Sequence, residues 1–171
     1  VQLDTNAMAL ALHTNNVTFN GVPQPTGFGV LPTSLNVVST DKITWIVTFT
    51  GNTDAGTDGF NSAMDGVYDL TITAAKVHPN GVPGITMAAN ATTTFHRLFG
   101  DTGLPDTPSG GTPGVDFSAI VNTGDNLAFR GAFNNPLTYN AALDFNGDAA
   151  INTGDNLQFR NRFNKALTWR V

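Results

Sequence analysis

The sequence predicts a β-rich chain with a small α-helical part: an antiparallel β-sandwich over residues 1–98, followed by two loop–helix repeats over residues 99–171. Two observations predict this fold class. About seven short candidate strands, two of which clearly alternate apolar and polar residues, lie between turn dipeptides such as Asn20-Gly21 and Asn80-Gly81, which is typical of immunoglobulin-like sandwiches. Beyond residue 120, the chain contains an internal repeat whose apolar residues indicate a helix in each copy.

The clearest of the predicted strands are Lys42–Thr50 and Val67–Ala74. In the first, Ile43, Trp45 and Val47 alternate with polar residues, which predicts one buried and one exposed face. Trp45 is therefore expected in the core. Shorter candidate strands are Ala7–His13, Val17–Asn20, Phe28–Leu31, Leu35–Ser39 and Thr92–His96.

The composition supports a strand-rich fold and excludes several functions. Thr, Asn, Asp and Gly are abundant and Glu is absent, which disfavours long helices and suits strands and turns. The net charge of -5 gives no electrostatic footprint for nucleic acid or for an anionic membrane. No Cys is present for disulfides or zinc, and no apolar run is long enough to span a bilayer. We interpret this composition as that of a secreted or cell-surface bacterial chain.

The internal repeat is the most informative feature of the sequence. Val121–Asn140 recurs 30 residues later as Ile151–Arg170, with 12 of 20 positions identical. Each copy predicts a polar loop followed by a helix that begins near Thr123 or Thr153. The apolar sides of the two helices are predicted to consist of Leu127, Phe129 and Phe133, and of Leu157, Phe159 and Phe163.

The second copy begins with a loop whose oxygen-bearing side chains have the spacing of a calcium ligand set. In the 12 residues Asp144–Asp155, such side chains stand at positions 1, 3, 5, 9 and 12, and position 7 can contribute its backbone carbonyl. Three carboxylates offset the charge of the ion. Ala149 stands at position 6, where such loops have Gly, which predicts a strained or differently shaped turn. The predicted ligands are Asp144, Asn146, Asp148, Ala150, Asn152 and Asp155.

The first copy of this loop is interrupted, and its occupation by a second ion is left open. Counted back from Asp125 at position 12, position 1 is Gly114, which has no side-chain oxygen. Asp101, which precedes the Pro- and Gly-rich segment Asp101–Gly114, can fill that position instead. Alternatively, Asp116 is itself position 1 of a loop shortened by two residues. The candidate ligands of this copy are Asp101, Asp116, Ser118, Ile120, Asn122 and Asp125.

The paired loop–helix repeats resemble a type I dockerin, specifically the dockerin-like C-terminal modules of planctomycete surface and secreted proteins. The resemblance is carried by Phe95–Asp101 (FHRLFGD), Tyr139–Asp148 (YNAALDFNGD) and the two helices. In that family the first of these segments joins a β-sandwich to the first calcium loop, which implies position 1 for Asp101. Asp65–Ile72 (DGVYDLTI) resembles late strands of bacterial immunoglobulin- or cadherin-like modules. The insertion Thr102–Pro113 departs from the family pattern.

The resemblance implies a calcium-stabilised, non-catalytic module that attaches to a protein partner, either a cohesin-like protein or a second copy. Gly131-Ala132 and Asn161-Arg162 differ between the two helices, which argues against a symmetric cohesin contact. A structural subunit of an extracellular layer or filament is an alternative, and a carbohydrate-binding sandwich that uses Trp45 is another. No catalytic motif is present, and the three histidines are scattered, so no enzyme is expected.

The join between the two predicted parts is apolar. Phe95, Leu98 and Phe99 lie there without a Gly/Pro spacer before Gly100. Three exposed large side chains in five residues would make a costly patch, so we expect burial and a rigid join. The predicted partners are the helix aromatics Phe133 and Phe163 or the post-helix residues Tyr139 and Trp169.

Overall fold

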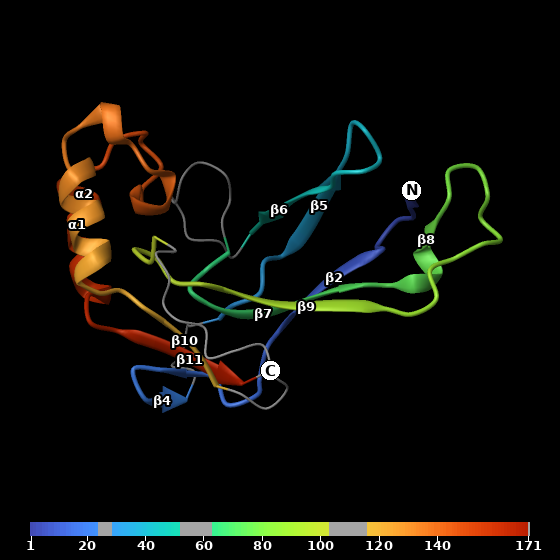
Figure 1. Cartoon of the computed structure of the whole chain (residues 1–171), viewed down its shortest axis with the longest axis horizontal. Coiled ribbons are helices and arrows are strands. Elements are labelled where there is room, and N and C mark those ends of the chain that lie inside the picture. The colour runs from blue at the N-terminus through green and yellow to red at the C-terminus, as the bar shows by residue number, and fades with distance from the viewer. Residues whose placement is uncertain (24–28, 52–62, 103–115, 171) are drawn as a thin grey trace.

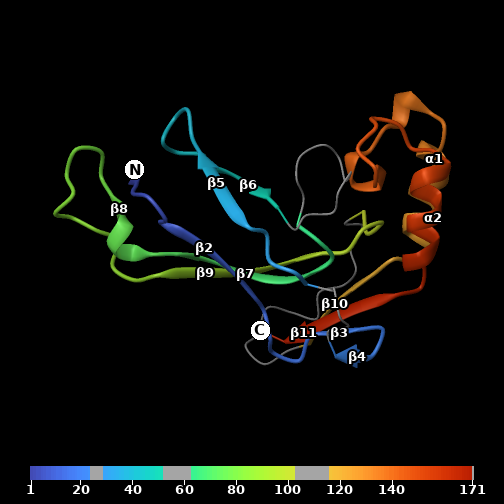
Figure 2. The same cartoon turned by 180° about the vertical axis from the view of Figure 1, so that it is seen from behind.

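The computed structural model describes residues 1–23, 29–51, 63–102 and 116–170, and this part of the chain is mostly β-structure (Figure 1). The strands form several antiparallel sheets, and the described residues contain two α-helices. The predicted class, β-rich with a small α part, is therefore confirmed. The two helices lie side by side at one end of the molecule, whereas the N-terminus lies toward the other end (Figures 1 and 2).

A three-stranded antiparallel sheet has β7 as its middle strand, with β2 and β9 on either side. Tyr68 of β7 is fully buried, and its hydroxyl donates to the carbonyl of Met64 at 2.6 Å. The ring of Phe95 stacks on Tyr68 with centroids 5.5 Å apart. Each of the three strands corresponds to a predicted one, and β7 is the one predicted from its period-2 pattern. The bounds are β2 (Met8–Leu12), β7 (Gly66–Ile72) and β9 (Ala91–Arg97).

Two further antiparallel pairs lie toward the N-terminal end of the molecule (Figure 1). The predicted strand Lys42–Thr50 begins four residues too early, because a turn around Asp41 precedes β6. The backbone N–H groups of Ile43 and Thr44 donate to the Asp41 carboxylate and lower its pKa to about 2. Ile43 is consequently exposed, contrary to the prediction, and Trp45, expected in the core, is only partly buried and is not part of the hydrophobic core cluster. The pairs are β5 (Ser34–Val38) with β6 (Ile46–Thr50), and β1 (Gln2–Leu3) with β8 (Val77–His78), which follows the 3-10 helix Ala74–Lys76.

A four-stranded sheet combines the two ends of the described chain, in the order β10-β11-β3-β4. Its strands are β3 (Thr18–Phe19), β4 (Val22–Pro23), β10 (Asp116–Ile120) and β11 (Ala166–Arg170). The hydroxyls of Thr18 and Thr168 form a 2.7 Å hydrogen bond between β3 and β11. Because this sheet joins segments from both sides of residue 98, the boundary proposed there stays a prediction. Of the predicted strand Phe28–Leu31, residue 28 lies outside the described residues and residues 29–31 form no strand.

Both helices begin where the sequence predicts, α1 (Thr123–Ala132) after Asn122 and α2 (Thr153–Arg162) after Asn152. Each begins with a capping box, which satisfies backbone N–H groups that have no partner within the helix. Two 3-10 helices, Pro136–Thr138 and Ala141–Leu143, lie in the connection. Neither described helix is long and apolar enough to cross a membrane.

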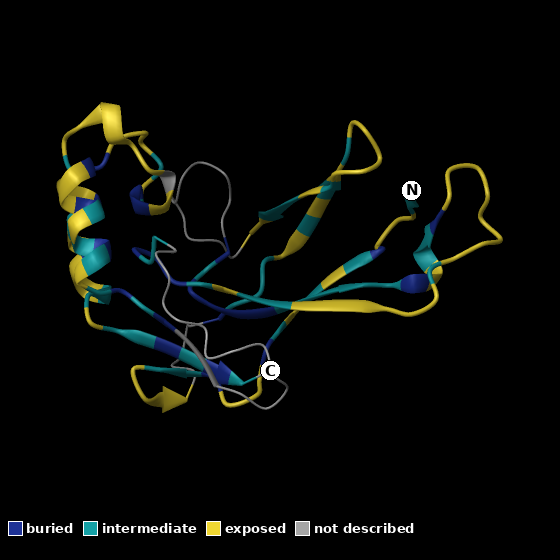
Figure 3. Cartoon of the chain, in the orientation of Figure 1, coloured by how far each residue is buried: buried dark blue, intermediate teal, exposed yellow. Residues whose placement is uncertain are grey.

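The helices contact each other and the rest of the molecule through their aromatic residues. Phe129 and Phe159 are buried and stack with ring centroids 4.6 Å apart. Leu127 and Leu157, predicted on the same apolar sides, are 65% and 61% exposed, so that prediction was wrong. Residues two apart lie about 200° apart around a helix and cannot both face one core. Figure 3 shows the resulting exposed faces of the two helices.

The apolar join is part of the core, as predicted for Leu98 and Phe99, which are buried; Phe95 is partly buried. Phe99 packs edge-on against Phe145 at 4.9 Å between centroids, and the ring of His96 lies 4.9 Å from that of Trp169. One hydrophobic cluster contains residues from both predicted parts, including Val17, Val67, Leu98, Phe99, Phe129, Phe159, Leu167 and Trp169.

Candidate metal centre

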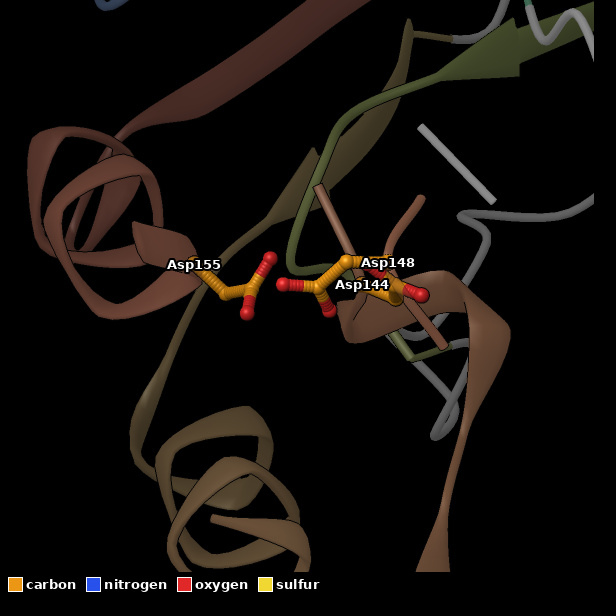
Figure 4. A group of neighbouring side chains, drawn as sticks. All are labelled: Asp144, Asp148 and Asp155. Carbon is orange, nitrogen blue, oxygen red and sulfur yellow. The ribbon is translucent and has the colours of Figure 1, made fainter. Parts of the chain in front are cut away.

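Three carboxylates converge in the loop that precedes α2 (Figure 4). Asp144, Asp148 and Asp155 each place one oxygen so that all three oxygens lie within 4.8 Å of one another. Asp144 and Asp155 are fully buried, whereas Asp148 is exposed. The sequence placed these residues at positions 1, 5 and 12 of a metal loop, and the fold brings all three together.

The carboxylate of Asp155 accepts hydrogen bonds from residues near the beginning and near the end of this loop. Its Oδ2 accepts from the backbone N–H of Asn152 at 2.8 Å, which is half of the capping box of α2. Its Oδ1 accepts from the N–H of Phe145 at 2.7 Å, directly after the first ligand position. A carboxylate in the first turn of a helix also interacts favourably with the helix dipole. The residue is therefore held in place by the chain whether or not an ion is bound.

Asp144 organises the turn in the middle of the loop. Its Oδ1 accepts from the N–H of Gly147 at 2.8 Å, and its Oδ2 accepts from the N–H of Ala149 and the hydroxyl of Tyr139, both at 2.9 Å. Gly147 and Ala149 both have positive φ, 67° and 63°. This conformation is unfavourable for Ala, in agreement with the strained turn predicted at position 6.

The carboxylate of Asp148 accepts hydrogen bonds from the two predicted amide ligands. Its Oδ2 accepts from the side-chain amides of Asn152 at 2.8 Å and Asn146 at 3.0 Å. Its Oδ1 accepts from the N–H of Ala150 at 2.9 Å. These hydrogen bonds, that of Asn152 first, lower the pKa of Asp148, so the carboxylate is ionised at neutral pH. Each amide would turn its oxygen toward an ion, while the Asn152 oxygen here accepts from the N–H of Gly154 at 2.8 Å.

The charge of this loop is not balanced by the described side chains. The ion pairs of the described residues involve Asp4, Asp65, Asp69 and Asp101, and none reaches the three loop carboxylates. Burying carboxylates with only neutral donors is costly unless a cation accompanies them. Because the donors are oxygens throughout, the set fits a hard divalent cation such as Ca²⁺, which takes six to eight oxygen ligands.

The first copy retains the hydrogen-bonded frame of the second. Asp125 is buried, its Oδ2 accepts from the N–H of Asn122 at 2.8 Å, and its Oδ1 accepts from the N–H of Thr102 at 2.9 Å. Thr102 thus takes the place that Phe145 has in the second copy. The preceding residue, Asp101, accordingly takes the place of Asp144, which supports Asp101 at position 1 among the alternatives.

The rest of the first copy differs from a metal loop. His96 Nε2 lies 3.2 Å from Asp101 Oδ2, so this carboxylate has a partner that Asp144 lacks. Asp116, Ser118 and Ile120 lie in β10, whose backbone is extended and paired with β11. The side chains of Asp116 and Ser118 are outside the described part, so their role as ligands stays a prediction. Within the described residues, no group of three potential ligands includes Asp101 and Asp125.

Sequence reasoning missed a buried charge cluster that connects α2 to the three-stranded sheet of β2, β7 and β9, which we call the central sheet. Asp65 accepts from Arg97 Nη1 at 2.6 Å, from the N–H of Phe99 at 2.7 Å and from Arg162 Nε at 2.5 Å. The Arg162 guanidinium also lies over the rings of Phe99 and Phe145, at 5.4 and 5.2 Å from their centroids. The partners are 32 and 97 residues from Asp65, and no local pattern indicates such a pairing.

Comparison with known proteins gives no assignment: the chain matches no protein-family model, no curated protein and no solved structure. The metal loop therefore has to be judged on its own geometry. That geometry consists of three converging carboxylates, two amides bound to one of them, and a capped helix that holds the last carboxylate. It supports a site for a cation and shows no arrangement of nucleophile and base.

Proposed function

We propose that this chain is a calcium-binding, non-catalytic attachment module of a secreted or cell-surface bacterial protein, with a dockerin-like pair of repeats. The observation that carries the proposal is the uncompensated acidic loop before α2. Two of its three carboxylates are fully buried, and their hydrogen-bond donors are neutral. A cation supplies the missing charge and binds only when the loop is folded.

The ion would act as a structural cross-link. The residues that would hold it are Asp144, Asn146, Asp148, Asn152 and Asp155, with the carbonyl of Ala150. Binding to the folded loop alone adds the binding free energy to folding. Because Phe145 in this loop contacts Phe99 and Arg162, that stabilisation extends to the end of the central sheet.

The exposed faces of the two helices support an attachment role. Leu127 and Leu157 occupy equivalent positions of the two repeats, and both are exposed. A partner that contacts both helices would find an apolar side chain at the same position of each. The partner is a cohesin-like protein or, in the alternative role of a layer or filament subunit, another copy of the chain.

The proposal is tested by sedimentation velocity and thermal unfolding with calcium and with chelator. We expect calcium to raise the unfolding temperature of the wild type and to leave Asp148→Asn unchanged. Leu127→Ser with Leu157→Ser should keep the calcium response and lose the association with a purified cohesin or with itself. If the unfolding temperature of the wild type is the same with calcium and with chelator, the proposal is contradicted.

A further inference from the structure

The strand β2 has an edge that no described strand covers. It lies at one side of its sheet, paired with β7 alone. The carbonyl of Ala7 accepts from Thr73 at 2.8 Å, and the N–H of His13 donates to Val67 at 3.0 Å. Backbone direction alternates along an antiparallel strand, so the odd-numbered residues face β7. The N–H and C=O groups of Met8 and Leu10 therefore point away from β7, and no described residue hydrogen-bonds to them.

A cleft of about 630 Å³ lies along this edge. Its opposite wall is formed by β5, which is paired with β6 alone in the described part of the chain. In Figures 1 and 2, β5 and β2 diverge toward the tip of the β5–β6 hairpin. Both strands and the turn before β6 contribute apolar residues to the lining, among them Met8, Leu10, Leu35, Val37 and Trp45.

We propose that this cleft binds an extended peptide segment of another protein, which adds to β2 as a further strand. Backbone groups at the free edge would supply the hydrogen bonds, and alternate apolar side chains of the peptide would pack beside Leu10 and Val37. Trp45, which lines the cleft, has a buried Nε1 without a hydrogen-bond partner. This site does not involve the metal loop and does not depend on calcium.

The charge of the cleft selects among possible peptides. Among the described residues that line the cleft, Asp4 is the one ionisable side chain, and its Oδ1 lies 3.0 Å from Nε2 of His78. The whole chain has a net charge of -5. At this cleft an uncharged to basic peptide is therefore favoured over an acidic one. The expected ligand is an uncharged to basic strand in which apolar residues alternate.

The test uses the full chain and an acetylated, amidated peptide of sequence KTVTVTVT, measured by isothermal titration calorimetry. We expect saturable one-to-one binding that is equal with calcium and with chelator. Methylating the peptide amides that face one edge should weaken binding by about tenfold or more, because those groups can no longer donate. A calcium-independent result separates this site from the proposed function of the metal loop.

A protein variant tests the same edge from the other side. Leu10→Pro removes an N–H that faces the cleft and none that faces β7, and proline is tolerated on edge strands. We expect about tenfold weaker peptide binding than for the matched variant Leu10→Ala, which keeps the N–H. If Leu10→Pro does not fold, the methylated peptide decides alone.

Four outcomes would overturn the proposal. They are no binding of the peptide at millimolar concentration, equal binding of the methylated peptide, a concentration-dependent dimer that Leu10→Pro abolishes, and displacement of the peptide by xylo- or cello-oligosaccharides. The third outcome assigns the edge to a second copy, and the fourth assigns the cleft to a carbohydrate.

Discussion

The two copies of the repeat share a frame and differ in what the frame holds. In each, an Asp in the first helical turn accepts from the N-cap residue and from the residue after the first acidic position, as Asp155 does from Phe145 and Asp125 from Thr102. In the second copy only 11 residues separate the two ends of this frame, Asp144 and Asp155. In the first, β10 is inserted between Asp101 and Asp125. The capping role of this Asp is thus separable from a metal-binding role.

The copies also balance their charges differently. Asp101 lies against His96, whereas the donors to Asp144 are two backbone N–H groups and Tyr139. At the end of the helix, Arg162 reaches the buried Asp65, and the equivalent residue of α1 is Ala132, which is buried in the core. One copy is therefore connected to the sheet by an ion pair, and the other by apolar packing.

The largest predicted effect comes from replacing Arg162 of α2 by Ala, the residue that stands at the equivalent position of α1. Arg162→Ala leaves Asp65 buried with one Arg partner fewer, and breaking such a pair costs about 3 kcal/mol of unfolding free energy. Denaturant unfolding measures this loss. The matched control, Arg160→Ala on the exposed side of the same helix, should change stability by less than about 0.5 kcal/mol. Equal losses in the two variants would show that the ion pair between Arg162 and Asp65 adds no more to the unfolding free energy than an exposed arginine does.

The next prediction separates capping from metal binding. In chelator, Asp155→Ala and Asp125→Ala should each lose about 1–2 kcal/mol, because each removes one capping box. With calcium at about 100 times its Kd, the wild type and Asp125→Ala should gain about 2.7 kcal/mol, and Asp155→Ala should gain nothing. Urea unfolding of the three proteins in both buffers provides the six free energies. A calcium gain that survives in Asp155→Ala and disappears in Asp125→Ala would reverse the assignment of the two copies.

A smaller effect is expected at the turn around Ala149 in the second copy. Ala149→Gly should stabilise the chain by about 0.5–1 kcal/mol, because φ of 63° is strained for Ala and free for Gly. The control is the neighbouring change Ala150→Gly. Ala150 does not have a positive φ, so glycine there only adds conformational freedom to the unfolded chain and should not stabilise the protein. Thermal unfolding resolves the difference. A destabilised Ala149→Gly would mean that the turn is not strained.

The smallest predicted effect concerns His78, which lies outside both copies of the repeat. The hydrogen bond from Asp4 raises the pKa of His78 above its ordinary value of 6.5, and the carbonyl of Pro79 adds to the shift. A raised pKa in the folded state gives a stabilisation that is complete below about pH 6.5 and is lost as pH rises through the folded value. Stability of the wild type should therefore fall from pH 6 to pH 8, and His78→Gln should remove this part of the slope. An unchanged slope would place the pH dependence in groups other than His78.

Local patterns predicted the elements that depend on short stretches of sequence. The strand β7 follows from period-2 alternation, β2 and β9 correspond to shorter candidate strands, and α1 and α2 begin where the repeat predicts. The convergence of the acidic loop also follows from spacing within 12 residues. Leu127 and Leu157 were misplaced because apolar character alone does not say which face of a helix is buried.

The features that the sequence did not predict are contacts between distant segments. The strands β10 and β11 pair with each other and join β3, about 150 residues away from β11. Asp65 stands at an ordinary Asp-Gly turn in the sequence, and its two arginine partners are fixed only by the packing of β9 and α2. Such pairs depend on the tertiary fold and leave no periodic signal.

The central claim, one calcium ion held by the second copy, is tested most directly by calorimetric titration of calcium into metal-free protein. The account predicts one exothermic or endothermic site per chain in the wild type and in Asp101→Asn, and no site in Asp148→Asn. Asp148 is exposed and caps no helix, so its replacement leaves the fold intact for the comparison. Calcium binding that is retained by Asp148→Asn, or lost in Asp101→Asn alone, would contradict the account.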